Sequence, residues 1–205
     1  MTALRVGTCP CTCDLRVEET PRLIALTGGP GAGKTAVLEM ASRALCRYVA
    51  ILPEAASLVF GGGFPRHDTR AGREAAQRAI YHIQRQLEAL VTNENEVRVA
   101  LCDRGTVDSL AYWPGDDDAF WSQVHSSLPE ELARYEAVIH LQTPNAEGGY
   151  NHQNPLRVET PEAAAALDAR IQQVWAAHPN RVIIPSATSF MDKAARALSE
   201  LGKLL

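Results

Sequence analysis

Residues 27–35 read Thr27-Gly28-Gly29-Pro30-Gly31-Ala32-Gly33-Lys34-Thr35, and the architecture of the remaining chain can be worked out from them. They contain the pattern Gly-x-x-x-x-Gly-Lys-Thr, the phosphate-binding loop or Walker A motif. The glycines let backbone N–H groups surround a phosphate, Lys34 reaches the β- and γ-phosphates, and the Thr35 hydroxyl ligates Mg²⁺. We therefore predict a nucleoside triphosphate with Mg²⁺, held by Gly28, Gly29, Pro30, Gly31, Ala32, Gly33, Lys34, Thr35 and Ala36.

The segments on either side favour this motif over an ordinary glycine-rich turn. Leu23-Ile24-Ala25-Leu26 is a short apolar run, typical of a buried parallel strand. Residues 36–46 have helical composition, and their apolar side chains recur at the spacing of one helix face. A helix that begins near Lys34 would direct its positive N-terminal end at the bound phosphate.

The composition limits the classes of protein that the chain can represent. With 205 residues and 46% hydrophobic content, the chain can form one α/β domain with a full core. Its formal net charge of −4 provides no general polyanion surface, so we expect no nucleic acid partner. No apolar run approaches the ~20 residues that cross a bilayer, and residues 1–14 lack the apolar core of a signal peptide. We expect a cytoplasmic protein without a membrane partner.

Three of the five cysteines lie together in Cys9-Pro10-Cys11-Thr12-Cys13. A thiolate metal site or a redox element is one interpretation, but the spacing is one residue and no second Cys/His pair nearby completes a zinc site. The alternative is a surface segment with incidental thiols, such as a hairpin between residues 4–6 and 15–17. We expect residues 1–20 to be an N-terminal extension and residues 21–205 to be a P-loop kinase-like ATPase domain.

Two carboxylates directly follow predicted strands. Residues 48–52 end before Pro53-Glu54, and residues 97–102 run into Asp103. The carboxyl ends of parallel strands form the edge where open α/β sheets bind ligands. Asp103 has the position of a Walker B carboxylate and is predicted to hold Mg²⁺ together with Thr35. Glu54 is predicted to face the transferred phosphoryl group or the substrate; alternatively it is an exposed acid at a helix start.

Other polar residues near these strand ends are predicted to contact a substrate. Arg66 lies in the glycine-rich connection 61–70, and Arg104 and Asp108 come shortly after Asp103. The pair Tyr112-Trp113 either lines a pocket that stacks a planar ring or belongs to the core. A helix is expected after residue 70, and the residues predicted on its apolar face are Ala76, Ile80, Ile83, Leu87 and Leu90.

The second half contributes two more strands, at 137–141 and 182–184, each followed by a helix. Residues 143–157 are polar and glycine-rich and have the composition of a mobile lid. Arg157 is the cation of this stretch, and a lid arginine can neutralise charge on a transferring phosphoryl group. The alternative for Arg157 is an ordinary surface or ion-paired arginine. His140, in the middle of a strand, is predicted to be a packed core histidine.

Five short strands that alternate with helices indicate an α/β fold, a P-loop NTPase of the kinase type. Here the chain resembles the small bacterial P-loop ATPases related to the nicotinamide riboside kinase domain, an AAA-like ATPase domain family. The resemblance covers about residues 21–205. It is carried by residues 27–35, by Pro53-Glu54-Ala55-Ala56, by the stretch from Asp103-Arg104-Gly105 to Tyr112-Trp113, and by Thr160-Pro161-Glu162-Ala163.

The resemblance implies a five-stranded parallel sheet of order 2-3-1-4-5 flanked by helices, an arginine-bearing lid, and binding of ATP and Mg²⁺. It also suggests kinship with deoxynucleoside kinases. In those enzymes a Glu after the second strand acts as base toward the acceptor hydroxyl, and an acid–arginine pair follows the third strand. Glu54 and Asp103-Arg104 match these positions. Lids of such kinases carry two or more arginines, whereas this one has Arg157 alone.

The leading hypothesis is a phosphotransferase that moves the γ-phosphate of ATP to a hydroxyl of a small nucleoside-like or cofactor-precursor acceptor. Its predicted catalytic residues are Lys34, Glu54, Asp103 and Arg157. The alternative is a regulatory ATPase or NTPase in which hydrolysis switches an interaction with a protein partner, and a nucleotide-sensing module without catalysis is a third possibility. A homodimer is compatible with each of them.

Overall fold

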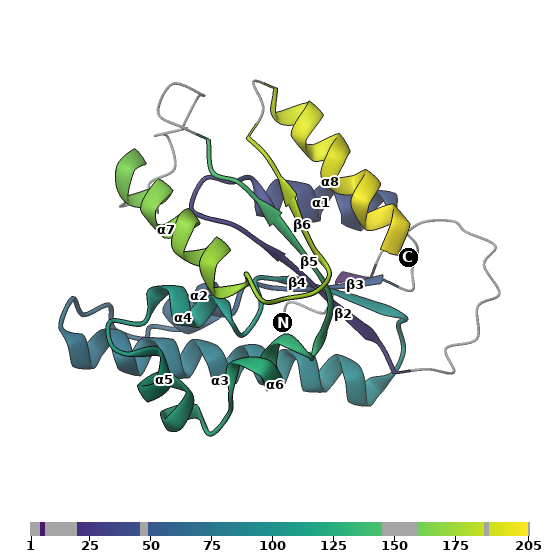
Figure 1. The fold of residues 1–205 in the computed structure, drawn as a ribbon. Helices are drawn as coiled ribbons and strands as arrows, with labels where there is room; N and C mark the ends of the chain where they lie inside the picture. Colours follow the sequence, from purple (N-terminus) through teal and green to yellow (C-terminus); the bar gives the residue numbers. More distant parts are fainter. Residues whose placement is uncertain (1–4, 7–19, 46–48, 145–159, 187–188, 205) are drawn as a thin grey trace.

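The computed structural model describes residues 5–6, 20–45, 49–144, 160–186 and 189–204. One twisted sheet lies between two layers of helices (Figure 1). Its strands are β1 (Arg5–Val6), β2 (Arg22–Thr27), β3 (Val49–Leu52), β4 (Val99–Asp103), β5 (Tyr135–Leu141) and β6 (Arg181–Ile184). The helices are α1 (Lys34–Ala44), α2 (Ala55–Gly61), α3 (Arg70–Glu94), α4 (Asp108–Tyr112), α5 (Asp117–Val124), α6 (Leu128–Leu132), α7 (Pro161–Val174) and α8 (Phe190–Leu204).

The sheet order is β1-β3-β4-β2-β5-β6, and all neighbours except β1 and β3 are parallel. The five parallel strands therefore have the predicted order 2-3-1-4-5. The sixth strand was not predicted: Arg5–Val6, within the expected N-terminal extension, pairs antiparallel with β3. Residues 15–17, the other arm of the hairpin considered for this extension, lie outside the described residues.

The strand register brings the sequence motifs to one edge of the sheet. Leu26 at the end of β2 is opposite Asp103 at the end of β4, and Thr27 is opposite His140 in β5. Because the three strands are parallel, the loop after β2 and the carboxylate that ends β4 leave the sheet at the same edge. The phosphate loop and the predicted metal ligand are neighbours for this reason.

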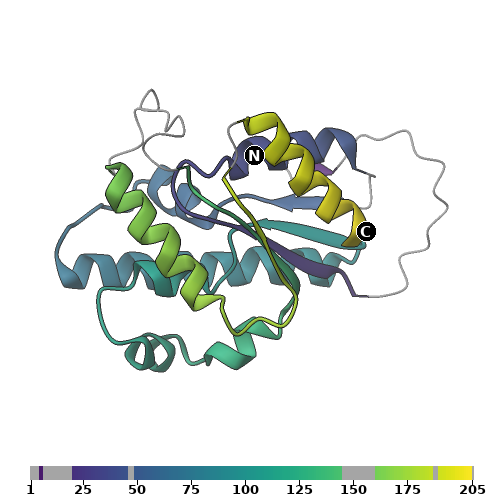
Figure 2. The same cartoon turned by 45° about the horizontal axis from the view of Figure 1, so that its top comes forward.

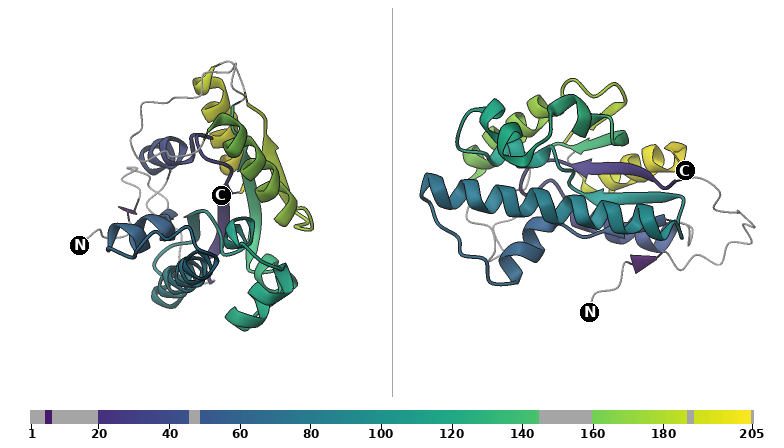
Figure 3. Two further views of the ribbon diagram at one scale, coloured as in Figure 1. Left: turned by 90° about the vertical axis from the view of Figure 1, so that its left-hand side faces the viewer. Right: turned by 90° about the horizontal axis from the view of Figure 1, so that it is seen from below.

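The helices bury the two faces of the sheet in separate cores. Helices α1 and α8 lie together on one face (Figure 2), where Leu26, Val37, Leu101 and Leu201 are buried in one hydrophobic cluster. The other face is covered mainly by α3, α4, α5 and α7. Helix α3, with 25 residues, extends along much of the length of the molecule in the right-hand view of Figure 3. This two-sided burial is what parallel strands rich in aliphatic residues require.

The predicted apolar face of α3 is wrong in part: Ala76 is buried and Leu87 is partly buried against the core, as predicted. Ile83 and Leu90 are exposed, and the buried residues are Ala76, Gln77, Tyr81, Gln84, Glu88 and Val91. The helix is rotated toward this mixed face because its polar groups have partners inside the protein: Tyr81 donates to Glu131, and Glu88 accepts from Gln84 and Tyr135. A pattern that counts only apolar residues misses such a face, because a paired polar group can be buried at little cost.

Two helices begin at side-chain caps that are typical of helix starts. The Thr160 hydroxyl accepts a hydrogen bond from the Ala163 N–H, with Pro161 at the first position of α7. Asp116 caps α5 in the same way through the Asp118 N–H. These caps satisfy N–H groups that have no partner within the helix.

Several predicted features fall outside the described residues. They are most of the lid-like stretch with its Arg157, and Cys9, Cys11 and Cys13 of the extension. Cys102 is fully buried in β4, as expected for a small core residue.

Candidate active site

The phosphate loop has the backbone conformation that its glycines were expected to permit. Gly28, Gly31 and Gly33 have φ values of 137°, 78° and 92°, a region that favours glycine. Gly28 also approaches the backbone of β5 so closely that a Cβ would overlap the Leu141 carbonyl oxygen. Any larger residue at Gly28 would therefore push the loop off the sheet.

Helix α1 begins at the end of this loop with an open N-terminus. Gly33 is its N-cap residue and provides no side chain, and the first turn contains no acidic residue. Ala36 and Thr35 are exposed in that turn, while Ala32 is buried beneath it. The N–H groups of the first turn and the positive end of the helix dipole are thus directed outward, where an anion can approach.

Lys34 is held against the loop from which it projects. Its side chain is buried, with 8% of the residue exposed, and its Nζ donates to the carbonyl oxygens of Gly28 (2.8 Å) and Gly29 (3.1 Å). Burial and the neighbouring Arg104 guanidinium lower the pKa of Lys34 to about 8, although Asp103 and Glu54 favour the charged form. The ammonium group lies beside the loop and is still protonated near neutral pH.

Asp103 ends β4 as a buried carboxylate with an unsatisfied oxygen. Only 7% of the residue is exposed, and its Oδ1 has no hydrogen-bonding partner among the described residues. Burial raises the pKa of Asp103 to about 6, an effect that Lys34 opposes and Glu54 reinforces. Buried oxygens are rarely left unpaired, so Asp103 Oδ1 is well suited to bind a ligand such as a cation.

Thr35 and Asp103 line the same hollow, which makes them suitable ligands for Mg²⁺. Mg²⁺ in phosphotransfer sites takes only one or two protein ligands and completes its shell with phosphates and water. In agreement, no group of three or more His, Cys, Asp or Glu residues that could hold a metal occurs in the described part of the chain. The roles of Thr35 and Asp103 stay predictions.

Glu54 is fixed at the carboxyl end of β3 by two donors. Arg104 Nε donates to its Oε1 at 2.8 Å, and the Ser57 hydroxyl donates to its Oε2 at 2.5 Å. Burial alone would raise the pKa of Glu54, but the Arg104 charge and these hydrogen bonds outweigh it, so the pKa is lowered. Glu54 is also the N-cap residue of α2, so the alternative of an acid at a helix start describes its position correctly.

Arg104 connects the phosphate loop to this carboxylate. It has a positive φ of 72°, and its Nη1 donates to the Gly28 carbonyl at 3.1 Å while its Nε contacts Glu54. A third contact, to Asp108 Oδ1 at 3.4 Å, completes the set. Two carboxylates therefore share this guanidinium, so the arginine fixes Glu54 rather than offering an uncompensated charge to a ligand.

Asp108, which was predicted to contact a substrate, is almost completely buried. Only 3% of the residue is exposed. The donors to its two oxygens are Thr27 Oγ1, the Gly105 N–H (2.9 Å), Trp175 Nε1 (3.2 Å) and Arg104. Because its oxygens are occupied, we expect Asp108 to act by holding the loop after β4 in shape.

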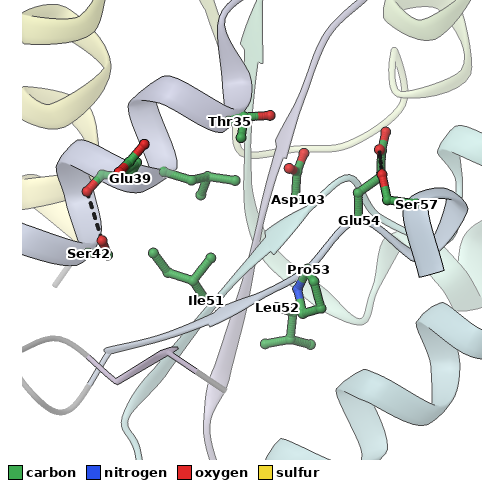
Figure 4. Close-up of a pocket in the computed structure, with 10 residues that line it drawn as sticks. Thr35, Glu39, Ser42, Ile51, Leu52, Pro53, Glu54, Ser57 and Asp103 are labelled. Atoms are coloured by element: carbon green, nitrogen blue, oxygen red, sulfur yellow. Dashed lines mark hydrogen bonds between the residues drawn. The ribbon is translucent and has the colours of Figure 1, made fainter. Parts of the chain in front are cut away.

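Two hollows meet at Glu54, each with a volume of about 410 Å³. The first lies between α1 and β3, and Figure 4 shows Thr35, Asp103 and Glu54 around it. The second lies between α2, α3 and α4. Thr35, Glu54 and Ser57 line both. A molecule in the second hollow would therefore touch the carboxylate that borders the phosphate loop.

Polar and aromatic side chains both line the second hollow. The Arg66 guanidinium lies 4.0 Å from the centre of the Phe60 ring, and the Arg104 guanidinium lies 5.5 Å from the centre of the Tyr112 ring. The aromatic pair of the sequence thus separates: Tyr112 lines the hollow, whereas Trp113 is buried in the core. Arg66 lines the hollow as predicted for a substrate contact, although its role is not tested.

Three residues near the loop were not predicted. The Gln77 amide lines the second hollow from α3, Asp168 of α7 accepts a hydrogen bond from the Gly29 N–H at 2.7 Å, and Lys193 of α8 donates to the Ala32 carbonyl at 2.8 Å. No motif marks them, because they lie on helices distant in sequence from the loop. The sequence signal that could have indicated Asp168 and Lys193 is a charged residue on the apolar face of a predicted amphipathic helix, because charged residues are rarely buried without a partner.

The fold and this edge of the sheet define a P-loop protein of the kinase type. The model of a family described as "AAA domain" matches residues 23–193, so the chain belongs to this AAA domain family. The AAA-like P-loop family inferred from the sequence is thereby confirmed.

A solved structure of similar fold is the thymidylate kinase from Candida albicans, with a TM-score of 0.59 and 13% sequence identity. The match covers 90% of this chain and 92% of the kinase. At this identity the likeness shows the fold alone, a fold that implies nucleotide binding and usually Mg²⁺. No curated protein gives a significant match. None of the described helices is long and apolar enough to span a membrane.

Proposed function

We propose that the protein is a phosphotransferase that moves the γ-phosphate of ATP, with Mg²⁺, to a hydroxyl of a small nucleoside-like or cofactor-precursor molecule. The observation that carries this proposal is the position of Glu54. It borders both the hollow that contains Thr35 and Asp103 and the second hollow beside α3. An acceptor in the second hollow would have its hydroxyl between the carboxylate and the triphosphate.

The state of Glu54 suits the role of a base. The Arg104 charge and the Ser57 hydrogen bond hold its pKa below the ordinary value despite burial, so it is ionised at neutral pH. An ionised, oriented carboxylate can accept the proton of a hydroxyl as that hydroxyl attacks phosphorus. Since phosphoryl transfer needs mainly positioning and charge neutralisation, orienting the hydroxyl is as important as accepting its proton.

The second hollow supports a small organic acceptor. Its volume of about 410 Å³ lies in the lower part of the range of small-molecule sites. Tyr112 and Phe60 offer ring faces, while Gln77 and Arg66 offer hydrogen-bonding groups. A site that only activated water would not require this mixed lining.

The remaining residues would act on the nucleotide. The loop amides and Lys34 would bind the phosphates, and Thr35 and Asp103 would hold Mg²⁺, which neutralises charge on the phosphate oxygens. Arg157, which lies outside the described residues, is proposed to approach the transferred group from the lid. All of these roles rest on the motif positions together with the contacts described above.

The test is a screen of nucleosides and vitamin-like alcohols that follows ADP release against a control without acceptor. We expect one acceptor to stimulate ADP release and to yield a phosphorylated product by mass spectrometry. Glu54→Gln should then bind ATP normally but transfer about 10²- to 10⁴-fold more slowly, the range for loss of a general base. Normal transfer by this variant would rule out the base role.

The same screen addresses the regulatory ATPase alternative. ADP release that no acceptor stimulates, but that a protein partner does, would replace the phosphotransferase proposal. In that case Glu54 would orient a water molecule instead of an acceptor hydroxyl.

A further inference from the structure

Asp168 is a buried acid that the proposed reaction does not use. It lies on α7, with 6% of the residue exposed. Asp168 contacts the phosphate loop at the Gly29 N–H, whereas Arg104 contacts it at the Gly28 carbonyl oxygen. A buried carboxylate beside a loop that binds a polyanion is electrostatically unfavourable, so its presence calls for a physical reason.

The contacts of Asp168 centre on the loop. Its Oδ1 accepts the Gly29 N–H at 2.7 Å and lies 3.0 Å from His140 Nε2 and 3.3 Å from the donating Thr143 hydroxyl. Its Oδ2 accepts from Gln172 Nε2 at 3.1 Å. Burial would raise the pKa of Asp168, but His140 and the other donors lower it, so the group is a carboxylate. The bond to Gly29 is therefore charge-assisted.

The Gly29 N–H shares a peptide unit with the Gly28 carbonyl. That carbonyl accepts from Lys34 Nζ at 2.8 Å and from Arg104 Nη1 at 3.1 Å. One peptide plane is thus held from both sides, by the Asp168 carboxylate at its N–H and by two cations at its oxygen. Its orientation decides whether the Gly28 oxygen is available to Lys34, whose Nζ also donates to the Gly29 oxygen at 3.1 Å.

A peptide between two glycines can turn over more easily than any other, because neither neighbour has a Cβ to restrict the rotation. In the reversed orientation the Gly28 oxygen would face the Asp168 carboxylate and would lose its contacts with Lys34 and Arg104, so that Lys34 would keep only its weaker contact with the Gly29 oxygen among the two loop carbonyls. The ionised carboxylate repels a carbonyl oxygen and binds an N–H group. It therefore selects the observed orientation.

We propose that Asp168 is a positioning residue for nucleotide binding: by holding the Gly29 N–H, it keeps the Gly28–Gly29 peptide in the orientation that places Lys34 at the phosphate site. This inference rests on the proposed function only in taking a triphosphate as the ligand of the loop. When part of the free protein has the reversed peptide, the apparent Kd for nucleotide equals the intrinsic Kd divided by the fraction of molecules with the competent peptide.

The test compares Asp168→Ala, Asp168→Asn and the control Gln172→Ala, which removes a donor to the other oxygen and leaves the Gly29 bond in place. Loss of a hydrogen bond to a charged group predicts a Kd for Mg·ATP about tenfold higher in Asp168→Ala. Asp168→Asn retains a neutral acceptor and should fall between wild type and Asp168→Ala. Gln172→Ala should bind like wild type. Calorimetry measures all four proteins.

A merely structural role would give a different pattern. Reduced stability alone lowers the active fraction, and so kcat, without changing the affinity of the folded molecules. Positioning instead predicts a raised KM for ATP with kcat at saturation unchanged within about twofold, because bound nucleotide restores the loop. Unchanged Kd and KM in both Asp168 variants would overturn the proposal.

A second measurement needs no activity. Selective ¹⁵N labelling of the 14 glycines allows the Gly29 amide to be followed by NMR. The charge-assisted bond predicts a strongly downfield amide proton in wild type and Gln172→Ala, which moves upfield in Asp168→Asn. If the Gly29 signal does not differ between these proteins, the proposal is wrong. If nucleotide binds but no acceptor is phosphorylated, the proposed function fails while the affinity and NMR tests of Asp168 stand.

Discussion

The molecule contains two groups of buried charged residues, which differ in whether their carboxylate oxygens have hydrogen-bonding partners. Between α3, α6 and β5, Glu88 and Glu131 are fully buried, yet every carboxylate oxygen has a donor. The donors to this cluster are Tyr81 (2.7 Å), Gln84 (2.8 Å), Arg85 (2.8 Å), Thr106 (2.7 Å), Ser126 (2.7 Å), Tyr135 (2.6 Å) and Arg134. At the carboxyl edge of the sheet, by contrast, Asp103 has an oxygen with no partner in the described part of the chain and a pKa raised to about 6.

The difference separates a structural role from a functional one. A buried charge with all its partners present stabilises one arrangement and resists change. A buried charge that lacks a partner lowers stability, and proteins retain such costs mainly at sites that a ligand completes. We therefore expect substitutions in the first cluster to affect folding and substitutions at the sheet edge to affect ligand binding.

The largest effect is expected for Lys34→Ala at the sheet edge. Loss of the ammonium group removes the charge that neutralises the transferring phosphate, so turnover should fall about 10³-fold. Unfolding by urea should change little, because a desolvated cation is removed along with its two hydrogen bonds. ADP release measures the first effect, with Lys203→Ala as the control, since Lys203 is an exposed lysine that pairs with Glu200 at the surface. Wild-type turnover in Lys34→Ala would show that Lys34 does not neutralise the transferring phosphate.

In the paired cluster, Glu88→Gln should act on stability alone. It leaves the Arg134 cation without its closest carboxylate, and breaking a buried ion pair costs about 3 kcal/mol. Urea unfolding measures the change, and Glu200→Gln, which disrupts a surface pair, should cause little. Kinetic constants per folded molecule should equal those of wild type. A raised KM for ATP would show that the two groups of charge are not independent.

Asp103→Asn should stabilise the protein while it removes Mg²⁺-dependent nucleotide binding. The pKa of Asp103 rises from an ordinary 3.8 to about 6 on folding, so the folded state disfavours its charge by about 3 kcal/mol at pH 7. Because the pKa of Asp103 is higher in the folded state than in the unfolded state, the cost of its charge to folding grows as the pH rises from about 4 to about 6. The gain in urea stability should therefore be present at pH 7 and absent below pH 4. A loss of stability at pH 7 would mark Asp103 as a structural turn residue.

The smallest effect concerns the pH dependence of transfer. Because Arg104 and Ser57 lower the pKa of Glu54, the acid limb of kcat/KM should lie below the ordinary carboxyl pKa of 4.5. Arg104→Gln should move this limb to higher pH, and Ser57→Ala should move it less in the same direction. Profiles of kcat/KM measure both. An identical acid limb in all three proteins would mean that Glu54 does not titrate in catalysis.

Much of the fold could be predicted from short-range patterns. The glycine spacing of residues 27–35 restricts the backbone whatever surrounds it, and apolar runs followed by caps such as Thr160-Pro161 mark strand and helix limits. The strand order was implied by the resemblance to a known family. The face of α3 could not be predicted, because Gln84 and Glu88 are buried by partners on β5 and neighbouring residues.

The sequence alone determined that a triphosphate loop exists, which residues form it, and that acids follow the second and third parallel strands, because these properties depend on neighbours in the chain. Tertiary structure decided which of those groups are paired. Glu54 is paired with Arg104 and Ser57, one Asp103 oxygen has no partner among the residues that the structure describes, and Asp168 reaches Gly29 from a helix 139 residues further along. Hydrogen bonds and desolvation depend on atoms brought together by folding, and sequence separation does not reveal them.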